Sequence, residues 1–175
     1  MPVRLVEVYR GGIVESVHYG SIVVVDTDGH IIYELGNPER FTYFRSAAKP
    51  LIAISSLEAG IAEEFGLDLK EIAIIASSHT GEKTHIETFT GILEKTGIRL
   101  EQLKCGEHPP LYHEAAVELY ASGGAPTSLH CNCSGKHLGI MAAAKLKGMS
   151  VDDYYMPDHP IYNDIETVLS DFCRI

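Results

Sequence analysis

A serine and a lysine three residues apart are the first residues in this sequence that could do chemistry. Segment 44–50 reads FRSAAKP, and the spacing of Ser46 and Lys49 places both side chains on one face of a helix start. A serine hydroxyl needs an adjacent base to become a nucleophile, and a neutral lysine amine can be that base. The pattern indicates acyl transfer at Ser46. A helix start with Ser46 as its cap and Lys49 in solvent fits the same letters.

A second polar segment, ASSHTGE at 76–82, follows the apolar run 72–76. Functional residues often lie in a loop at the end of such an element. The hydroxyl of Ser78 could relay a proton or bind a substrate, with His79 beside it. The alternative is local, because Ser78 or Thr80 could cap the helix that begins after Glu82.

The third segment, HCNCSGKH at 130–137, is dense in groups that bind metals or take part in catalysis. Gly135 and the apolar stretch after it predict a loop that enters a helix, where backbone N–H groups can hold an anion or an oxyanion. Cysteine and histidine make zinc chemically reasonable, but the spacing matches no closed structural zinc site. We interpret the segment as an active-site loop. The proline-fixed loops at 105–110 and 158–160 suit structural turns at least as well.

Strands and helices must position these segments. Residues rich in Val, Ile and Tyr predict strands at 3–9, 13–19 and 21–26, and Asp28-Gly29 predicts a tight hairpin turn before 31–33. Apolar spacing predicts helices at 46–60, 83–95, 112–122, 135–147 and 160–172, whereas the run 72–76 fits a strand or a buried helix. We therefore expect an α+β fold, an antiparallel strand meander followed by helices, in a single domain over 1–175.

Composition narrows the class of protein. The 175 residues are 45% hydrophobic and 22% charged, with a formal net charge of -10, as in a soluble globular chain without the basic face of a nucleic-acid binder. No apolar run approaches the roughly 18 residues of a membrane span. The N-terminus has no signal-peptide pattern, so we expect a cytoplasmic protein. Its four cysteines are then expected to be thiols.

Taken in order, these segments resemble the asparaginase II family. The resemblance rests on the three segments above, on VYRGGIVESVHYG at 8–20 and on CGEHP at 105–109, and it covers nearly the whole chain. It implies a fold similar to those of serine β-lactamases and glutaminases. It also implies hydrolysis of L-asparagine, a small-molecule substrate, to L-aspartate and ammonia.

The resemblance implies roles for particular residues. Ser46 matches the nucleophile, Lys49 its paired base and Ser78 a second catalytic serine. Cys133 and Lys136 match positions that share a zinc ion with a further cysteine. The residues expected to bind the substrate are Arg45, His79 and Asn132.

Some features depart from the family pattern. Family members continue into a further half that holds an Asp-Gly-Cys segment and another lysine, so we expect this chain to be an N-terminal half with little or no activity alone. Cys131 stands where Asn is expected, and Tyr162 where Gln is usual. An uncovered core would also expose apolar surface, for which a homodimer is one expected outcome.

Two other functions are compatible with the same residues. The Ser46–Lys49 pair would serve a penicillin-recognising or glutaminase-like serine hydrolase, although the Cys133–Lys136 loop would then have no role. A non-catalytic zinc- or thiol-binding module could keep the same fold. The preference between asparagine and glutamine also stays open.

Overall fold

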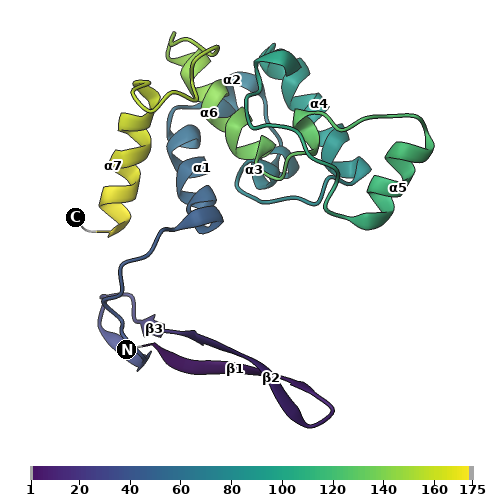
Figure 1. The fold of residues 1–175 in the computed structure, drawn as a ribbon. Coiled ribbons are helices and arrows are strands. Elements are labelled where there is room, and N and C mark those ends of the chain that lie inside the picture. The colour runs from purple at the N-terminus through teal and green to yellow at the C-terminus, as the bar shows by residue number, and fades with distance from the viewer. Residues whose placement is uncertain (1, 174–175) are drawn as a thin grey trace. The chain divides into compact units, whose positions relative to one another are not determined.

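The computed structural model describes residues 2–173, in which four β-strands come first and seven α-helices follow (Figure 1). This order and mixture confirm the expected α+β class. The closer likeness to the serine β-lactamase fold stays a prediction. The chain divides into two compact units, Met1–Tyr43 and Phe44–Ile175, and each is described by itself below.

The first unit consists of two β-hairpins. The strands are β1 (Val3–Arg10), β2 (Ile13–Gly20), β3 (Ile22–Val25) and β4 (Ile31–Leu35). Antiparallel pairs form between β1 and β2 and between β3 and β4, so the strands make two separate two-stranded sheets and not one continuous meander. The reason is local. Only Ser21 separates β2 from β3, and a tight hairpin needs a loop of about two residues.

Glycines with positive φ lie in the connections of both hairpins. Gly11 and Gly12 connect β1 to β2 with φ of 55° and 83°, which glycine adopts without steric cost. Between β3 and β4, the Asp26 carboxylate accepts hydrogen bonds from the backbone N–H groups of Asp28 and His30, and Gly29 has φ of 85°. The predicted hairpin is therefore present, but its β-turn is centred on Thr27 and Asp28, because the Gly29 N–H donates to the Asp26 carbonyl at 3.1 Å.

The second unit is helical. It contains the 3-10 helices η1 (Arg45–Ala48), η2 (Leu100–Gln102) and η3 (Ser128–His130), and the α-helices α1 (Lys49–Glu58), α2 (Ile61–Phe65), α3 (Leu69–Ile75), α4 (Lys83–Thr96), α5 (His113–Ala121), α6 (Ser134–Leu146) and α7 (Ile161–Cys173). The ambiguous run 72–76 is mostly helical. Asp68 caps α3 by accepting the N–H of Glu71, and the Glu71 carboxylate accepts the N–H of Asp68 in return.

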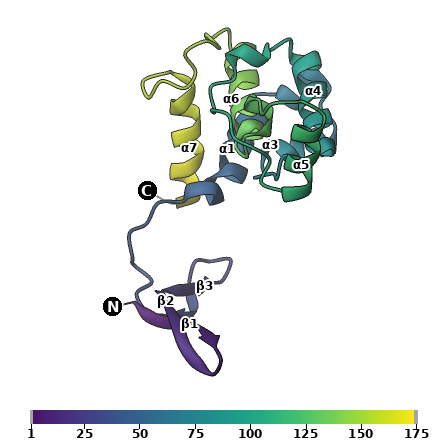
Figure 2. The ribbon, with the colours of Figure 1, turned by 45° about the vertical axis from the view of Figure 1, so that its right-hand side comes forward.

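Helix α6 forms the centre of this unit. It packs against α1, α2, α3, α4 and α7, and Figures 1 and 2 both show it among them. Leu138, Met141 and Ala144 of α6 are fully buried. Small residues let neighbouring backbones approach. A Cβ atom added at Gly135 would lie 2.2 Å from the carbonyl oxygen of Ile74 at the end of α3. The first turn of α6 is thus seated directly on α3.

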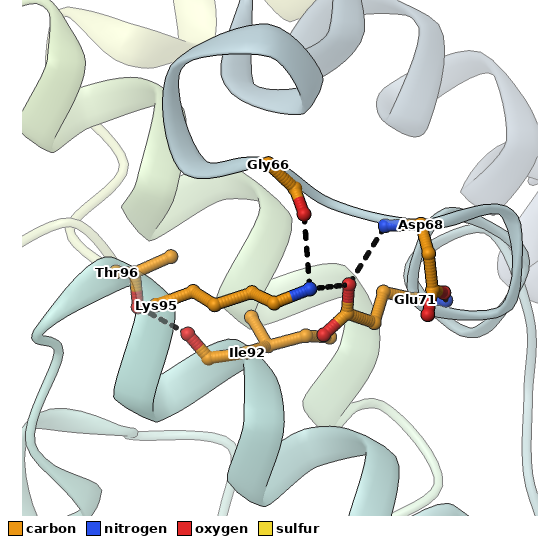
Figure 3. A network of polar contacts seen from close by, with 6 residues as sticks. All are labelled: Gly66, Asp68, Glu71, Ile92, Lys95 and Thr96. Atoms are coloured by element: carbon orange, nitrogen blue, oxygen red, sulfur yellow. Dashed lines mark hydrogen bonds and ion pairs between the residues drawn. The ribbon is translucent and has the colours of Figure 1, made fainter.

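An ion pair ties the start of α3 to the end of α4 (Figure 3). The Lys95 amine lies 2.6 Å from the buried Glu71 carboxylate and donates a second hydrogen bond to the carbonyl of Gly66 at 2.9 Å. Because the same carboxylate oxygen accepts the N–H of Asp68, the Glu71 side chain links the cap of its own helix to α4. Among residues 2–173, no helix has the length and apolar character that crossing a membrane requires.

Candidate active site

Ser46 and Lys49 lie where a 3-10 turn becomes helix α1. Ser46 belongs to η1 and is exposed, whereas Lys49 is the first residue of α1 and only 2% exposed. Pro50 follows in the first turn, where its missing N–H leaves no helical hydrogen bond unmade. In the described chain, 2–173, the Ser46 hydroxyl makes no hydrogen bond, to Lys49 or to any other group. Direct contact between Ser46 and Lys49 therefore stays a prediction.

The backbone immediately before Ser46 is in a rarely populated conformation. Arg45 has φ of 53°, and it is the one residue other than glycine with positive φ within 2–173. Such a conformation costs about 1–3 kcal/mol and is concentrated at functional sites. The Arg45 guanidinium is exposed and forms no ion pair in the described chain. Both observations suit a residue that meets a ligand beside Ser46.

Three parts of the sequence meet at the Lys49 amine. Lys49 Nζ donates hydrogen bonds to Ser78 Oγ at 2.7 Å and to the backbone carbonyl of Asn132 at 2.8 Å. No carboxylate pairs with it in the described chain. Neutral acceptors therefore satisfy a buried amine, which is unusual for lysine. Of the predicted site residues, the structure brings Lys49, Ser78 and Asn132 into direct contact.

The loop after α3 carries Ser78 and His79, which have different surroundings. Ser78 is exposed apart from its bond to Lys49, whereas His79 is 4% exposed. His79 Nδ1 accepts the N–H of Gly81, so the ring proton lies on Nε2, which donates to Ser134 Oγ at 2.8 Å. Burial lowers the pKa of His79 to about 4, which keeps the ring neutral near pH 7. Both ring nitrogens are occupied, which favours a positioning role over direct contact with a substrate.

The backbone of Asn132 is held from two sides. Its carbonyl accepts from Lys49, and its N–H donates to His108 Nε2 at 3.1 Å. His108 Nδ1 in turn donates to the carbonyl of Pro109 at 2.7 Å, which fixes the tautomer. The CGEHP segment therefore positions the Asn132 backbone, whose carbonyl accepts the hydrogen bond from Lys49. The sequence marks His108 by the prolines that follow it, but its position in the sequence could not predict Asn132 as its partner.

The sequence analysis did not predict the contact between His137 and Tyr154. Tyr154 is fully buried, and its hydroxyl accepts the N–H of Lys104 at 2.9 Å and lies 2.7 Å from His137 Nδ1. Burial lowers the pKa of His137 to about 4. The Tyr154 hydroxyl therefore donates to a neutral His137, and this bond fixes the ring in the first turns of α6.

Cys133 and Lys136 are the two residues implied in zinc binding. Both are half-buried at the start of α6 and three residues apart, so they lie on one face. A zinc site needs about four ligands. In residues 2–173, Cys133 belongs to no group of three His, Cys, Asp or Glu residues whose ligand atoms lie close together; the one such group is the exposed Asp26, Asp28 and His30. The described residues therefore do not define a complete set of zinc ligands at α6.

Comparison with known proteins gives the family. The sequence model described as L-asparaginase II matches residues 6–175, nearly the whole chain. No curated protein matches. The chain therefore belongs to the L-asparaginase II family. Membership suggests an asparaginase-type amidohydrolase with a small-molecule substrate.

Proposed function

We propose that the protein hydrolyses L-asparagine to L-aspartate and ammonia through a serine nucleophile assisted by Lys49. The observation that carries this proposal is the buried Lys49 amine, hydrogen-bonded to Ser78 and to the Asn132 carbonyl without a carboxylate partner. Family membership supports the reaction class. Strongly desolvated amines of this kind are common where proton transfer takes place.

The hydrogen bonds of Lys49 suit a neutral amine. Such an amine has two N–H donors and one lone pair. The two acceptors found around Nζ, Ser78 Oγ and the Asn132 carbonyl, match the two donors. The lone pair is left to take a proton from a nucleophilic hydroxyl. We assign that hydroxyl to Ser46, one helical turn before Lys49, and a relay or leaving-group role to Ser78.

The reaction would be acyl transfer. Ser46 Oγ attacks the side-chain amide carbon of asparagine, and its proton passes to Lys49. The proton is then delivered to the departing ammonia, leaving an aspartyl ester on Ser46. Water, activated by the same amine, hydrolyses the ester. Backbone N–H groups would stabilise the oxyanion in both steps.

Arg45 and Asn132 are the residues we assign to substrate recognition. The exposed Arg45 guanidinium can bind a carboxylate of the amino acid in a bidentate manner. The Asn132 side-chain amide makes no hydrogen bond inside the described chain, so it is available to a ligand. His79 would act behind them, because its ring holds Ser134 at the start of α6.

We also propose that Cys133 and Lys136 hold a zinc ion, with the remaining ligands coming from outside this pair. The thiolate and the neutral amine are both suitable zinc donors, and the ion would help to hold substrate. The expected result is zinc in the purified protein, measured by elemental analysis, with loss of the metal in Cys133→Ser. Equal zinc content in Cys133→Ser and Cys173→Ser would contradict this assignment.

The test of the proposed function is ammonia release from L-asparagine by the purified chain, with L-asparagine binding followed by NMR titration as a readout that needs no turnover. Ser46→Ala should abolish ammonia release and keep binding. The matched control is Ser122→Ala, whose exposed hydroxyl bonds only to Leu119. If the folded protein neither releases ammonia nor binds L-asparagine, the proposal is overturned. If the protein hydrolyses a β-lactam or is covalently labelled by one, the penicillin-recognising alternative is favoured instead.

A further inference from the structure

Two thiols from separate loops meet beside the Asn132 backbone. Cys131 Sγ donates to the carbonyl oxygen of Cys105 at 3.3 Å, and Cys105 Sγ donates to the carbonyl of Ser128 at 3.3 Å. The same Ser128 carbonyl accepts the backbone N–H of Cys131. Each thiol therefore contacts a backbone carbonyl in the loop that carries the other cysteine.

A pocket lies next to the Cys105 end of this pair. Cys131 is buried and Cys105 is half-buried, and both are free thiols. Lys104, Gly106 and Ser128, which flank or contact Cys105, line a pocket of about 470 Å³. We expect a small disulfide reagent to approach the half-buried Cys105 from this pocket. Burial raises the pKa of Cys105 to about 12, so the reaction should be slow near neutral pH.

We propose that Cys105 and Cys131 are a disulfide-forming pair, oxidised by a low-molecular-weight disulfide of the glutathione type. In the first step, the thiolate of one cysteine attacks a reagent sulfur, forming a mixed disulfide and releasing one reagent thiol. In the second, the other cysteine's thiolate attacks the protein sulfur of that mixed disulfide and releases the second reagent thiol. Two cysteine thiols are oxidised, one reagent disulfide is reduced, and both protons leave on the released thiols.

The Cys105–Cys131 disulfide would cross-link two loops that position the Asn132 backbone near Lys49. The loop of Cys105 carries His108, which holds the Asn132 backbone N–H, and Asn132 is the neighbour of Cys131. The cysteines are 26 residues apart in sequence, so the cross-link would remove loop entropy from the unfolded chain. Oxidation should therefore raise the melting temperature by several degrees, and reduction should reverse the rise.

The experiment is disulfide mapping after incubation of the folded protein with oxidised glutathione, followed by alkylation. Trypsin alone leaves Cys105, Cys131 and Cys133 in one peptide, because Lys104 and Lys136 bound it. Added cleavage after glutamate separates residues 105–107 from 119–136. The expected product joins these two peptides, with the mass of two hydrogen atoms lost, in wild type and in Cys133→Ser.

Cys131→Ser should give no joined peptide and no rise in melting temperature on oxidation, whereas Cys173→Ser should behave as wild type. A mixed disulfide that never resolves, a bond that involves Cys133, or four alkylated cysteines after prolonged oxidation would each overturn the proposal. If a variant fails to fold, fragmentation of the joined wild-type peptides decides the question, because it shows whether Cys131 or Cys133 carries the alkyl group. Because no readout depends on asparagine, this result is independent of the proposed enzymatic function.

Discussion

The amine of Lys49 is buried in the second unit, where a lysine is costly. Its hydrogen bonds to Ser78 and the Asn132 carbonyl satisfy the donors but supply no negative charge. A core position selected for stability alone would favour an apolar side chain there. We propose that this amine, which contacts Ser78, serves proton transfer, and this proposal makes no use of the zinc ligands.

His79 gives a pH-dependent stability that can be measured. Its pKa is lowered to about 4 in the folded protein from an ordinary value of 6.5, mainly by burial. The unfolded state thus binds a proton at a higher pH than the folded state does, so stability is lost as pH falls from about 6.5 towards 4. In His79→Gln, the fall in unfolding free energy between pH 7 and pH 5, measured with urea, should be smaller than in wild type. An equal fall would show that His79 is not the responsible group.

The packing of α6 on α3 depends on Gly135. Alanine there would place its Cβ 2.2 Å from the Ile74 carbonyl oxygen and 2.9 Å from its carbon, and backbone cannot move aside as a flexible side chain can. We expect Gly135→Ala to lower the unfolding free energy by about 3 kcal/mol, the cost of severe overpacking. Gly91→Ala in α4 is the control. Its nearest contact is the Glu71 side chain at 3.2 Å, and the gain in helix propensity should offset the crowding. Equal effects of the two substitutions would contradict the close α3–α6 contact.

The link between α3 and α4 depends on the Glu71–Lys95 ion pair (Figure 3). Lys95→Met would leave the buried Glu71 carboxylate without its cation. Because the Lys95 side chain is 36% exposed, we expect a loss of about 2 kcal/mol, less than for a fully buried pair. Lys83→Met, which removes an exposed ion pair with Glu87 at 3.8 Å, should change stability little. Thermal or urea unfolding of both variants measures these losses, and equal losses would contradict the role given to the Glu71–Lys95 pair.

At the scale of the whole molecule, the chain divides near residue 43. Residues 37–44 form neither helix nor strand, and Phe41 and Tyr43 are exposed. Limited digestion with chymotrypsin should cut first after these aromatic residues and leave a helical fragment that begins near Phe44. First cuts within α1–α7 would contradict the division. The prediction of a single domain stays open until the fragment's unfolding has been compared with that of the whole chain.

Local features of the fold were predictable from the sequence, whereas the pairing of strands was not. The helix over 83–95 and the hairpin around Asp28-Gly29 follow from periodicity and turn chemistry, and both are present. The short helix α2 was not predicted, because five residues carry too little periodicity. Strand pairing as two hairpins depends on a single-residue connection at Ser21, which the strand pattern does not reveal.

The same limit applies to the site. Three-residue spacing predicted Ser46 with Lys49, but the observed partners of Lys49 are 29 and 83 residues away in sequence. Contacts of this range depend on how α1, the loop after α3 and the start of α6 pack together. Motif order selected segments that the structure brings together at Lys49, and only the three-dimensional packing shows which of their atoms meet.

The most direct test of the central claim is the rate of ammonia release from L-asparagine by Lys49→Met compared with Lys145→Met. Lys145 donates only to the Thr96 carbonyl and is exposed, so its loss should leave the rate unchanged. If Lys49 is the general base, Lys49→Met should lose about 1000-fold in kcat while keeping the wild-type circular dichroism spectrum. A folded Lys49→Met protein that releases ammonia within a few-fold of the control would contradict the proposed role of this amine.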